Sequence, residues 1–181
     1  MIYVFLANGF EEIEGLTVVD FLRRAELEVL TVGVSGKPIT GAHNIPVFCD
    51  LDESEVTLCD EIDAVVLPGG MPGTLNLEKS DTVKETIKYC ADNSKYVCAI
   101  CAAPSILGHM GLLENKKACC FPGFEDELSG AKVSFDYVCC DSKFITARGM
   151  GAAIDFSEKI TEVLTDKNKA KKIKQSLQCP Y

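Results

Sequence analysis

The chain has 181 residues, of which 47% are hydrophobic and 25% are charged. This length and composition suffice for one well-packed core, so we expect a single domain over residues 1–181. The net charge of −9 and the pI near 4.7 argue against a nucleic-acid partner, because phosphate binding requires clustered Lys and Arg.

The N-terminal residues 1–7 form a short apolar run without a basic leader. The run is too short for a signal peptide or a membrane span, so we expect a cytoplasmic protein with no membrane partner. Most of its ten cysteines are then expected to be free thiols, because reducing compartments seldom support disulfides.

Residues 2–7 are typical of a parallel strand buried on both faces. A helix follows, with Asn8 as its predicted cap and its end near Ala25. At 100° per residue, Glu14 falls on the apolar stripe of residues 18, 21 and 25, whereas Glu12 points the other way. A carboxylate on such a stripe is either a hydrated helix-end residue or a functional group.

The opposite side of this helix carries Leu16 and Val19 among polar residues. This second apolar patch suits a contact between two copies of the chain, so we expect a homodimer.

The next segments predict a strand over 27–34, a hairpin around 39 and 45–49, and a buried strand over 63–67. The last strand ends in a glycine-rich turn, residues 68–73. Ligands in open α/β sheets bind at the carboxyl ends of strands, and exposed N–H groups there can bind developing negative charge, which makes Gly70 an oxyanion candidate. A plain tight turn is the alternative.

Residues 95–108 have the pattern of a nucleophile elbow. A β-type run ends at Cys101, small residues follow, and Pro104 suits the first turn of a helix. The helix N-terminus favours an anion, so we expect a depressed pKa for Cys101 and a reactive thiolate. The alternative is a small, buried, unreactive cysteine.

The remaining chain predicts a helix over 81–93, a short strand over 118–121, a hairpin from 133–140 and 143–147, and a helix over 150–164. The basic run 167–174 is expected to be the solvated face of a terminal helix. Strands that alternate with helices predict an α/β fold with a doubly wound, mostly parallel sheet.

Several motifs together resemble the ThiJ/PfpI superfamily, and within it the branch of Parkinson disease protein 7 and its bacterial relatives. The matching segments extend from residue 2 to about 165, and their combined order is far more specific than any one of them. They are Phe10-Glu11-Glu12-Ile13-Glu14, Val19-Asp20, Arg23-Arg24-Ala25, Val65-Val66-Leu67-Pro68-Gly69-Gly70, Ala99-Ile100-Cys101-Ala102-Ala103-Pro104 and Thr146-Ala147-Arg148-Gly149.

The resemblance implies a flavodoxin-like sandwich that forms homodimers, with Cys101 as the reactive thiol and Glu14 hydrogen-bonded to it. It also implies an oxyanion site formed by the backbone N–H groups of Gly70 and Ala102, with no cofactor and no metal. The pocket around the thiol is then expected to include Glu11, Gly69, Phe121, Arg148 and Gly149.

The function that the resemblance implies is a glutathione-independent glyoxalase or deglycase that acts on 2-oxoaldehydes and their early adducts. The alternative is an oxidative-stress sensor or redox-regulated chaperone without turnover. A cysteine peptidase is disfavoured, because Ala102 stands where that branch carries His. Phe121 stands before Pro122 where some relatives carry His, which favours weak catalysis.

Whether Glu14 raises or lowers the pKa of Cys101 depends on whether the Glu14 carboxyl group is protonated. An ionised Glu14 raises the pKa of the thiol by repulsion, whereas a protonated Glu14 donates a hydrogen bond and lowers it. We therefore predict a shared proton, and expect Glu14 to relay a proton through an enediol after the thiolate has added to the aldehyde.

Other motifs have weaker support. Cys98 and Cys101 form a C-x-x-C, but Cys98 falls inside a strand, and the doublets at 119–120 and 139–140 lack the spacing of a zinc site. Residues 148–151 lack the third glycine of a dinucleotide fingerprint. His109 lies too far along its helix to reach Cys101, and a structural role is favoured for His43.

Overall fold

The structure is a computed structural model that describes residues 1–179. Its main sheet has seven strands in the order β10-β11-β7-β6-β1-β2-β5. All neighbours are parallel except the antiparallel pair of β10 and β11. The strands are β1 (Ile2–Leu6), β2 (Val29–Gly33), β5 (Leu51–Asp52), β6 (Ala64–Leu67), β7 (Tyr96–Ile100), β10 (Val138–Asp141) and β11 (Phe144–Ala147). The predicted flavodoxin-like, mostly parallel sheet is therefore confirmed.

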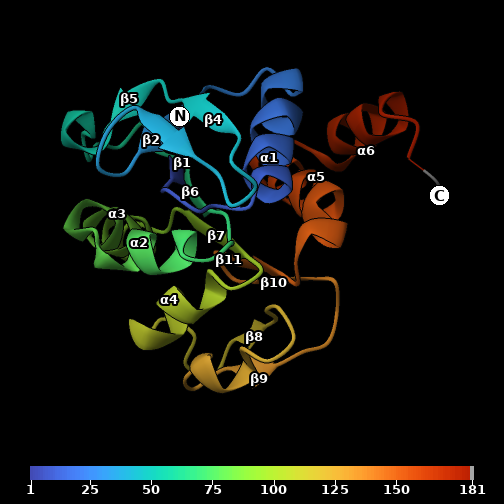
Figure 1. The fold of residues 1–181 in the computed structure, drawn as a ribbon. Coiled ribbons are helices and arrows are strands. Elements are labelled where there is room, and N and C mark those ends of the chain that lie inside the picture. Colours follow the sequence, from blue (N-terminus) through green and yellow to red (C-terminus); the bar gives the residue numbers. More distant parts are fainter. Residues whose placement is uncertain (180–181) are drawn as a thin grey trace.

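Helices cover both faces of this sheet (Figure 1). One face carries α1 (Glu12–Arg24), α5 (Ala153–Leu164) and α6 (Lys167–Ser176), in which α5 packs on both of the others. The other face carries α2 (Gly73–Lys79), α3 (Asp81–Asp92) and α4 (Pro104–His109).

The alternation of side chains along β1 explains the two layers. Ile2, Val4 and Leu6 join the apolar cluster under α1 and α5, whereas Tyr3 and Phe5 join the cluster under α3 and α4. Successive strand residues point to opposite faces, so a continuous apolar run is what a strand covered on both sides needs.

Several element boundaries differ from the sequence prediction. Glu11, not Asn8, caps α1, because the side chain of Asn8 accepts the Thr40 N–H at 2.8 Å. The predicted helix over 150–164 begins as a 3-10 turn, Met150–Ala152, and the predicted strand over 118–121 is only β8 (Lys117–Ala118). Strand β8 pairs in parallel with β9 (Lys132–Val133), so the hairpin is limited to β10 and β11.

The predicted hairpin around residues 39 and 45–49 is present as β3 (Pro38–Thr40) and β4 (Pro46–Phe48). The apolar patch predicted on α1 is not, because Val19 is buried and Leu16 packs partly against the core. The exposed large apolar side chains of the described residues instead include Ile13 at the start of α1, and Ile45 and Phe48 in or beside the hairpin.

All ten cysteines are free. Among the described residues, no helix has the length and apolar character needed to cross a membrane.

Candidate functional site

Cys101 lies at a sharp turn between β7 and α4. Its φ is +66°, a left-handed conformation that residues other than glycine rarely adopt and that costs energy unless neighbours enforce it. Two hydrogen bonds enforce it here. The Cys101 N–H donates to the Ala147 carbonyl at 2.9 Å, and the Cys101 carbonyl accepts the Phe121 N–H at 2.7 Å.

Glu14 reaches this turn from α1 and is fully buried. Its Oε2 accepts the Gly69 N–H at 2.9 Å, whereas Oε1 has no hydrogen-bond partner among the described residues. A side chain at Gly69 would begin 2.7 Å from Oε2 of Glu14 and 3.0 Å from Sγ of Cys101. The absence of a side chain at Gly69 therefore leaves the space in which acid and thiol approach each other.

The carboxyl group of Glu14 has a pKa close to neutral pH. Burial raises the pKa of Glu14 to about 7, although hydrogen bonds from Cys101 and Gly69 oppose the rise. Desolvation penalises the ionised carboxylate, and a partnerless oxygen adds to that cost. The raised pKa of Glu14 fits the predicted shared proton.

The prediction of a depressed pKa for the Cys101 thiol is wrong, because its pKa is raised. Burial, together with the charge of Glu14, raises the pKa of Cys101 to about 12, while the backbone amides of Ala102 and Gly70 oppose the rise. Helix α4 has only six residues, so its terminal dipole is outweighed by burial. Protonation of Glu14 would remove its charge and leave the two amides as the groups that favour a thiolate.

The turn after β6 places the Gly70 amide. Gly70 has φ +92°, and a Cβ there would lie 2.6 Å from the Gly9 carbonyl oxygen. Glycine is therefore required both by the backbone conformation and by the close approach of the segment after β1.

A shallow apolar groove of about 160 Å³ lies on the other side of Glu14. Phe121, Arg148, Gly149 and Tyr137 are among its lining residues. A Cβ at Gly149 would lie 3.2 Å from the Phe121 ring and 3.8 Å from Oε1 of Glu14. Gly149 thus lies between the groove and the buried acid. Of the residues predicted for the pocket, Phe121, Arg148 and Gly149 line this groove, whereas Glu11 and Gly69 do not.

Glu11 and Glu12 form a second polar cluster with His43. The carboxylate of Glu12 accepts the His43 N–H at 2.7 Å and lies 2.9 Å from its Nδ1, and Oε2 of Glu11 lies 3.6 Å from the same nitrogen. Burial raises the pKa of Glu12, but its bonds to His43 lower it overall, and the bond to Glu12 raises the pKa of His43.

This cluster is where the structure could hold a cation, because one ligand atom from each of the three residues lies within 4.8 Å of the others. The hydrogen bonds between Glu12 and His43 already hold the loop after β3 against α1. Sequence reasoning placed Glu12 away from Glu14, but it missed that the His43 loop would cover it. The adjacent carboxylates were the only available signal.

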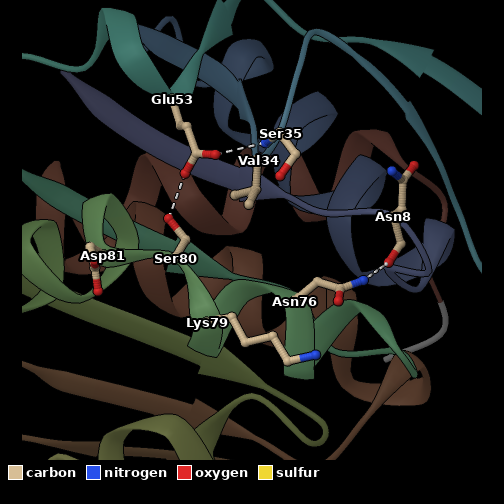
Figure 2. A pocket seen from close by; sticks show the side chains of 8 residues that line it. All are labelled: Asn8, Val34, Ser35, Glu53, Asn76, Lys79, Ser80 and Asp81. Carbon is tan, nitrogen blue, oxygen red and sulfur yellow. Dashed lines mark hydrogen bonds between the residues drawn. The ribbon is translucent and has the colours of Figure 1, made fainter.

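A larger cavity of about 490 Å³ lies at the carboxyl ends of β1 and β2 (Figure 2). It is polar, and Glu53 crosses it to accept hydrogen bonds from the Ser35 N–H at 2.8 Å and the Ser80 hydroxyl at 2.5 Å. None of the residues predicted for the thiol site lines it.

The sequence profile of the DJ-1/PfpI family matches residues 1–163. The chain belongs to the DJ-1/PfpI family. It is 33% identical to the Parkinson disease protein 7 homolog of Danio rerio over 96% of this chain and 94% of that protein. It is 30% identical to the glutathione-independent glyoxalase DJR-1.2 of Caenorhabditis elegans over 92% of this chain and 89% of that protein.

Solved structures agree with the DJ-1/PfpI assignment. The oxidised DJ-1 of Toxoplasma gondii superposes with a TM-score of 0.94 and 33% identity, covering 99% of this chain and 98% of that one. Two longer plant relatives match this chain over only 38% and 45% of their own lengths.

Two other predicted features of this DJ-1/PfpI chain lie outside the thiol site. His109 is held at the surface, where its ring nitrogens lie 2.5 Å from Glu78 and 2.8 Å from Glu127. Cys98 is fully buried inside β7, and burial raises the pKa of its thiol well above the usual value. The C-x-x-C spacing therefore does not place two accessible thiols together.

Proposed function

We propose that this chain is a cofactor-independent glyoxalase or deglycase that acts on 2-oxoaldehydes and the early adducts that they form on amines and thiols. One observation carries the proposal: a buried carboxyl group with a pKa near 7 contacts a partly buried thiol at a strained turn. Such a pair can supply a nucleophile and a proton carrier from two side chains.

The proposed reaction needs no external oxidant. The sulfur of Cys101 adds to the aldehyde carbon while its proton passes to Glu14. Glu14 then gives this proton to the aldehyde oxygen, which becomes the hydroxyl of a hemithioacetal and leaves Glu14 ionised. The backbone amides of Gly70 and Ala102 lie on the sulfur side of the site and suit the negative charge on that oxygen. Glu14 then removes the C–H proton of the former aldehyde carbon, which forms an enediol.

Return of a proton from Glu14 to the neighbouring carbon completes the internal redox change. The former aldehyde carbon is now oxidised to a thioester, and the former ketone carbon is reduced to an alcohol. Water adds to the thioester, the C–S bond breaks, and a 2-hydroxy acid leaves while the thiol regains its proton. The apolar groove at Phe121 and Gly149 suits the alkyl end of a small substrate.

Three further points extend this proposal. The chain acts as one domain, and two copies associate through Ile13, Ile45 and Phe48, which are respectively 50%, 50% and 77% exposed. Exposed apolar groups of this size favour burial in an interface. We also place the protein in the cytoplasm, where its free thiols would stay reduced.

The experiment is conversion of methylglyoxal to lactate by the purified protein without glutathione. The Cys101→Ser variant is expected to lose the activity, whereas Cys98→Ala, which removes a buried thiol three residues earlier, is expected to retain it. Equal activity of Cys101→Ser and wild type would contradict the proposal.

A sensor without turnover is the second candidate, and the partial exposure of Cys101 favours it. In that case the wild type forms no lactate, and mild peroxide adds two oxygens to Cys101 before the other nine cysteines react. Peptide mapping by mass spectrometry distinguishes this outcome, because uniform oxidation of the cysteines would contradict it.

A further inference from the structure

Two cysteines outside the thiol site lie against the same residue, Thr146, although they are twenty residues apart in the sequence. Cys119 follows β8, and Cys139 belongs to the edge strand β10. Both residues are buried, at 0% and 2% exposure.

Thr146 in β11 explains why these two side chains lie near each other. It is the register partner of Cys139 in the antiparallel pair, so their side chains lie on the same face of the sheet. Its hydroxyl accepts the Cys119 N–H at 2.9 Å, and its carbonyl oxygen lies 3.3 Å from Sγ of Cys119. One residue therefore positions both cysteines.

We propose that Cys119 and Cys139 are a second redox-active site, in which a hydroperoxide converts the two thiols into an intramolecular disulfide. Thr146 contacts Cys119 and faces Cys139 across the strand pair, so both side chains lie on one face of the sheet. The proposal does not depend on Cys101.

The surroundings make the two thiols unequal. Interaction with the Cys119 side chain lowers the pKa of Cys139 against the effect of burial, and Ser134 and Lys117 also lower it. The same interaction raises the pKa of Cys119. Cys139 is therefore the sulfur that attacks, and Cys119 is the one that resolves, because the thiolate is the reactive form.

The reaction balances with peroxide as the oxidant. The sulfur of Cys139 attacks one peroxide oxygen, the O–O bond breaks, and water leaves with a proton, so Cys139 becomes a sulfenic acid. The sulfur of Cys119 then attacks the oxidised sulfur, the S–O bond breaks, and a second water leaves with the Cys119 proton. Two thiols lose two electrons, which reduce one peroxide to two waters.

The loop over residues 134–137 controls access to the pair. Ser134 lies near enough to Cys139 to lower the pKa of its thiol, and the Tyr137 carbonyl lies 3.9 Å from Sγ of Cys119. The two large side chains of the loop, Phe135 and Tyr137, are 71% and 64% exposed, so little buried apolar surface holds it closed. Local opening of such a segment costs far less than global unfolding.

The disulfide would also affect the groove beside Glu14. Phe121 follows Cys119 by two residues, Tyr137 precedes Cys139 by two, and both line that groove. A covalent bond between the cysteines would fix the separation of these two walls. This consequence for substrate access rests on the proposed function, whereas the formation of the disulfide does not.

The test uses the Cys101→Ser protein, which removes the competing elbow thiol. Hydrogen peroxide is added, remaining thiols are alkylated in denaturant, and unreduced tryptic peptides are mapped. Cleavage gives one peptide over 118–132 and one over 133–143. We expect these two peptides to be cross-linked with the loss of two alkylatable thiols, and a reductant to restore both thiols.

Each of these peptides holds two cysteines, so variants assign the bond. Cys120→Ala and Cys140→Ala are expected to keep the cross-link, whereas Cys139→Ala is expected to lose it and leave Cys119 alkylatable. The proposal is overturned if the exposed Cys140 becomes oxidised while Cys119 and Cys139 remain thiols. A cross-link that persists in Cys139→Ala would overturn it equally. The peptide mapping of Cys101→Ser leaves Cys119 and Cys139 unchanged. The proposal can therefore be tested even if a variant at position 139 folds poorly.

Discussion

Replacement of Gly69 by Ala tests whether the close approach of Cys101 and Glu14 underlies the chemistry. The new methyl group would lie 2.6 Å from Cβ of Cys101, 2.7 Å from Oε2 of Glu14 and 3.0 Å from Sγ. Ordinary contact begins at 3.4 Å, so the Cβ contact must lengthen by about 0.8 Å, the difference between the two distances.

The displacement falls on the reacting groups themselves. Overpacking of this kind costs about 1–3 kcal/mol of folding free energy, and each kcal/mol lowers the melting temperature of a domain of this size by about 2–4 °C. A misplacement near 1 Å can reduce the rate by about 100-fold. We therefore expect Gly69→Ala to remain folded and to lose most of its methylglyoxal turnover.

The assay combines lactate formation with thermal unfolding. Gly151→Ala is the control for stability, because a Cβ there meets nothing within 4 Å, and its melting temperature should equal that of wild type. Wild-type turnover by a folded Gly69→Ala protein would refute the reasoning, since it would show that acid and thiol need not be in contact.

Three further predictions concern charge and the groove. Because burial raises the pKa of Glu14 to about 7, its contribution to stability is complete below about pH 4.5 and is lost as pH rises through 7. Wild type should therefore lose about 3 kcal/mol relative to Glu14→Gln across this range; a constant difference in denaturant titrations would contradict this. The His43 imidazole should titrate above its usual pKa of 6.5 by NMR, and Glu12→Gln should move it back, because Glu12 is the main cause of the rise; an unchanged titration would exclude that contact. Phe121→His should raise lactate formation by about 10-fold or more by adding a base to the groove; unchanged turnover would show that the imidazole does not reach the substrate.

The sequence was sufficient to predict the fold and to single out Glu14 and Cys101, whereas their pairing was an expectation from the family resemblance. The strands alternate with helices, Glu14 interrupts an apolar stripe, and Cys101 precedes small residues at a strand end, so each feature is local. The pKa of Cys101 was not predictable in the same way. It depends on how deeply the turn is buried and on the charge of Glu14, which only the packed structure shows.

Contacts between distant segments were also missed. Glu12 and His43 are 31 residues apart, and no periodicity connects them. The alternation of strand residues argues against a four-thiolate site in the two cysteine doublets. It did not show that one sulfur from each doublet, Cys119 and Cys139, shares a face with Thr146, because that depends on the register of β10 and β11.

Whether Cys101 and Glu14 act as one unit is best decided by comparing lactate formation in Glu14→Gln and Glu12→Gln. Both variants remove one buried carboxylate from the first turn of α1, but only the first removes the group beside the thiol. We expect loss of turnover in Glu14→Gln and turnover near the wild-type level in Glu12→Gln. Wild-type turnover by Glu14→Gln would contradict this expectation.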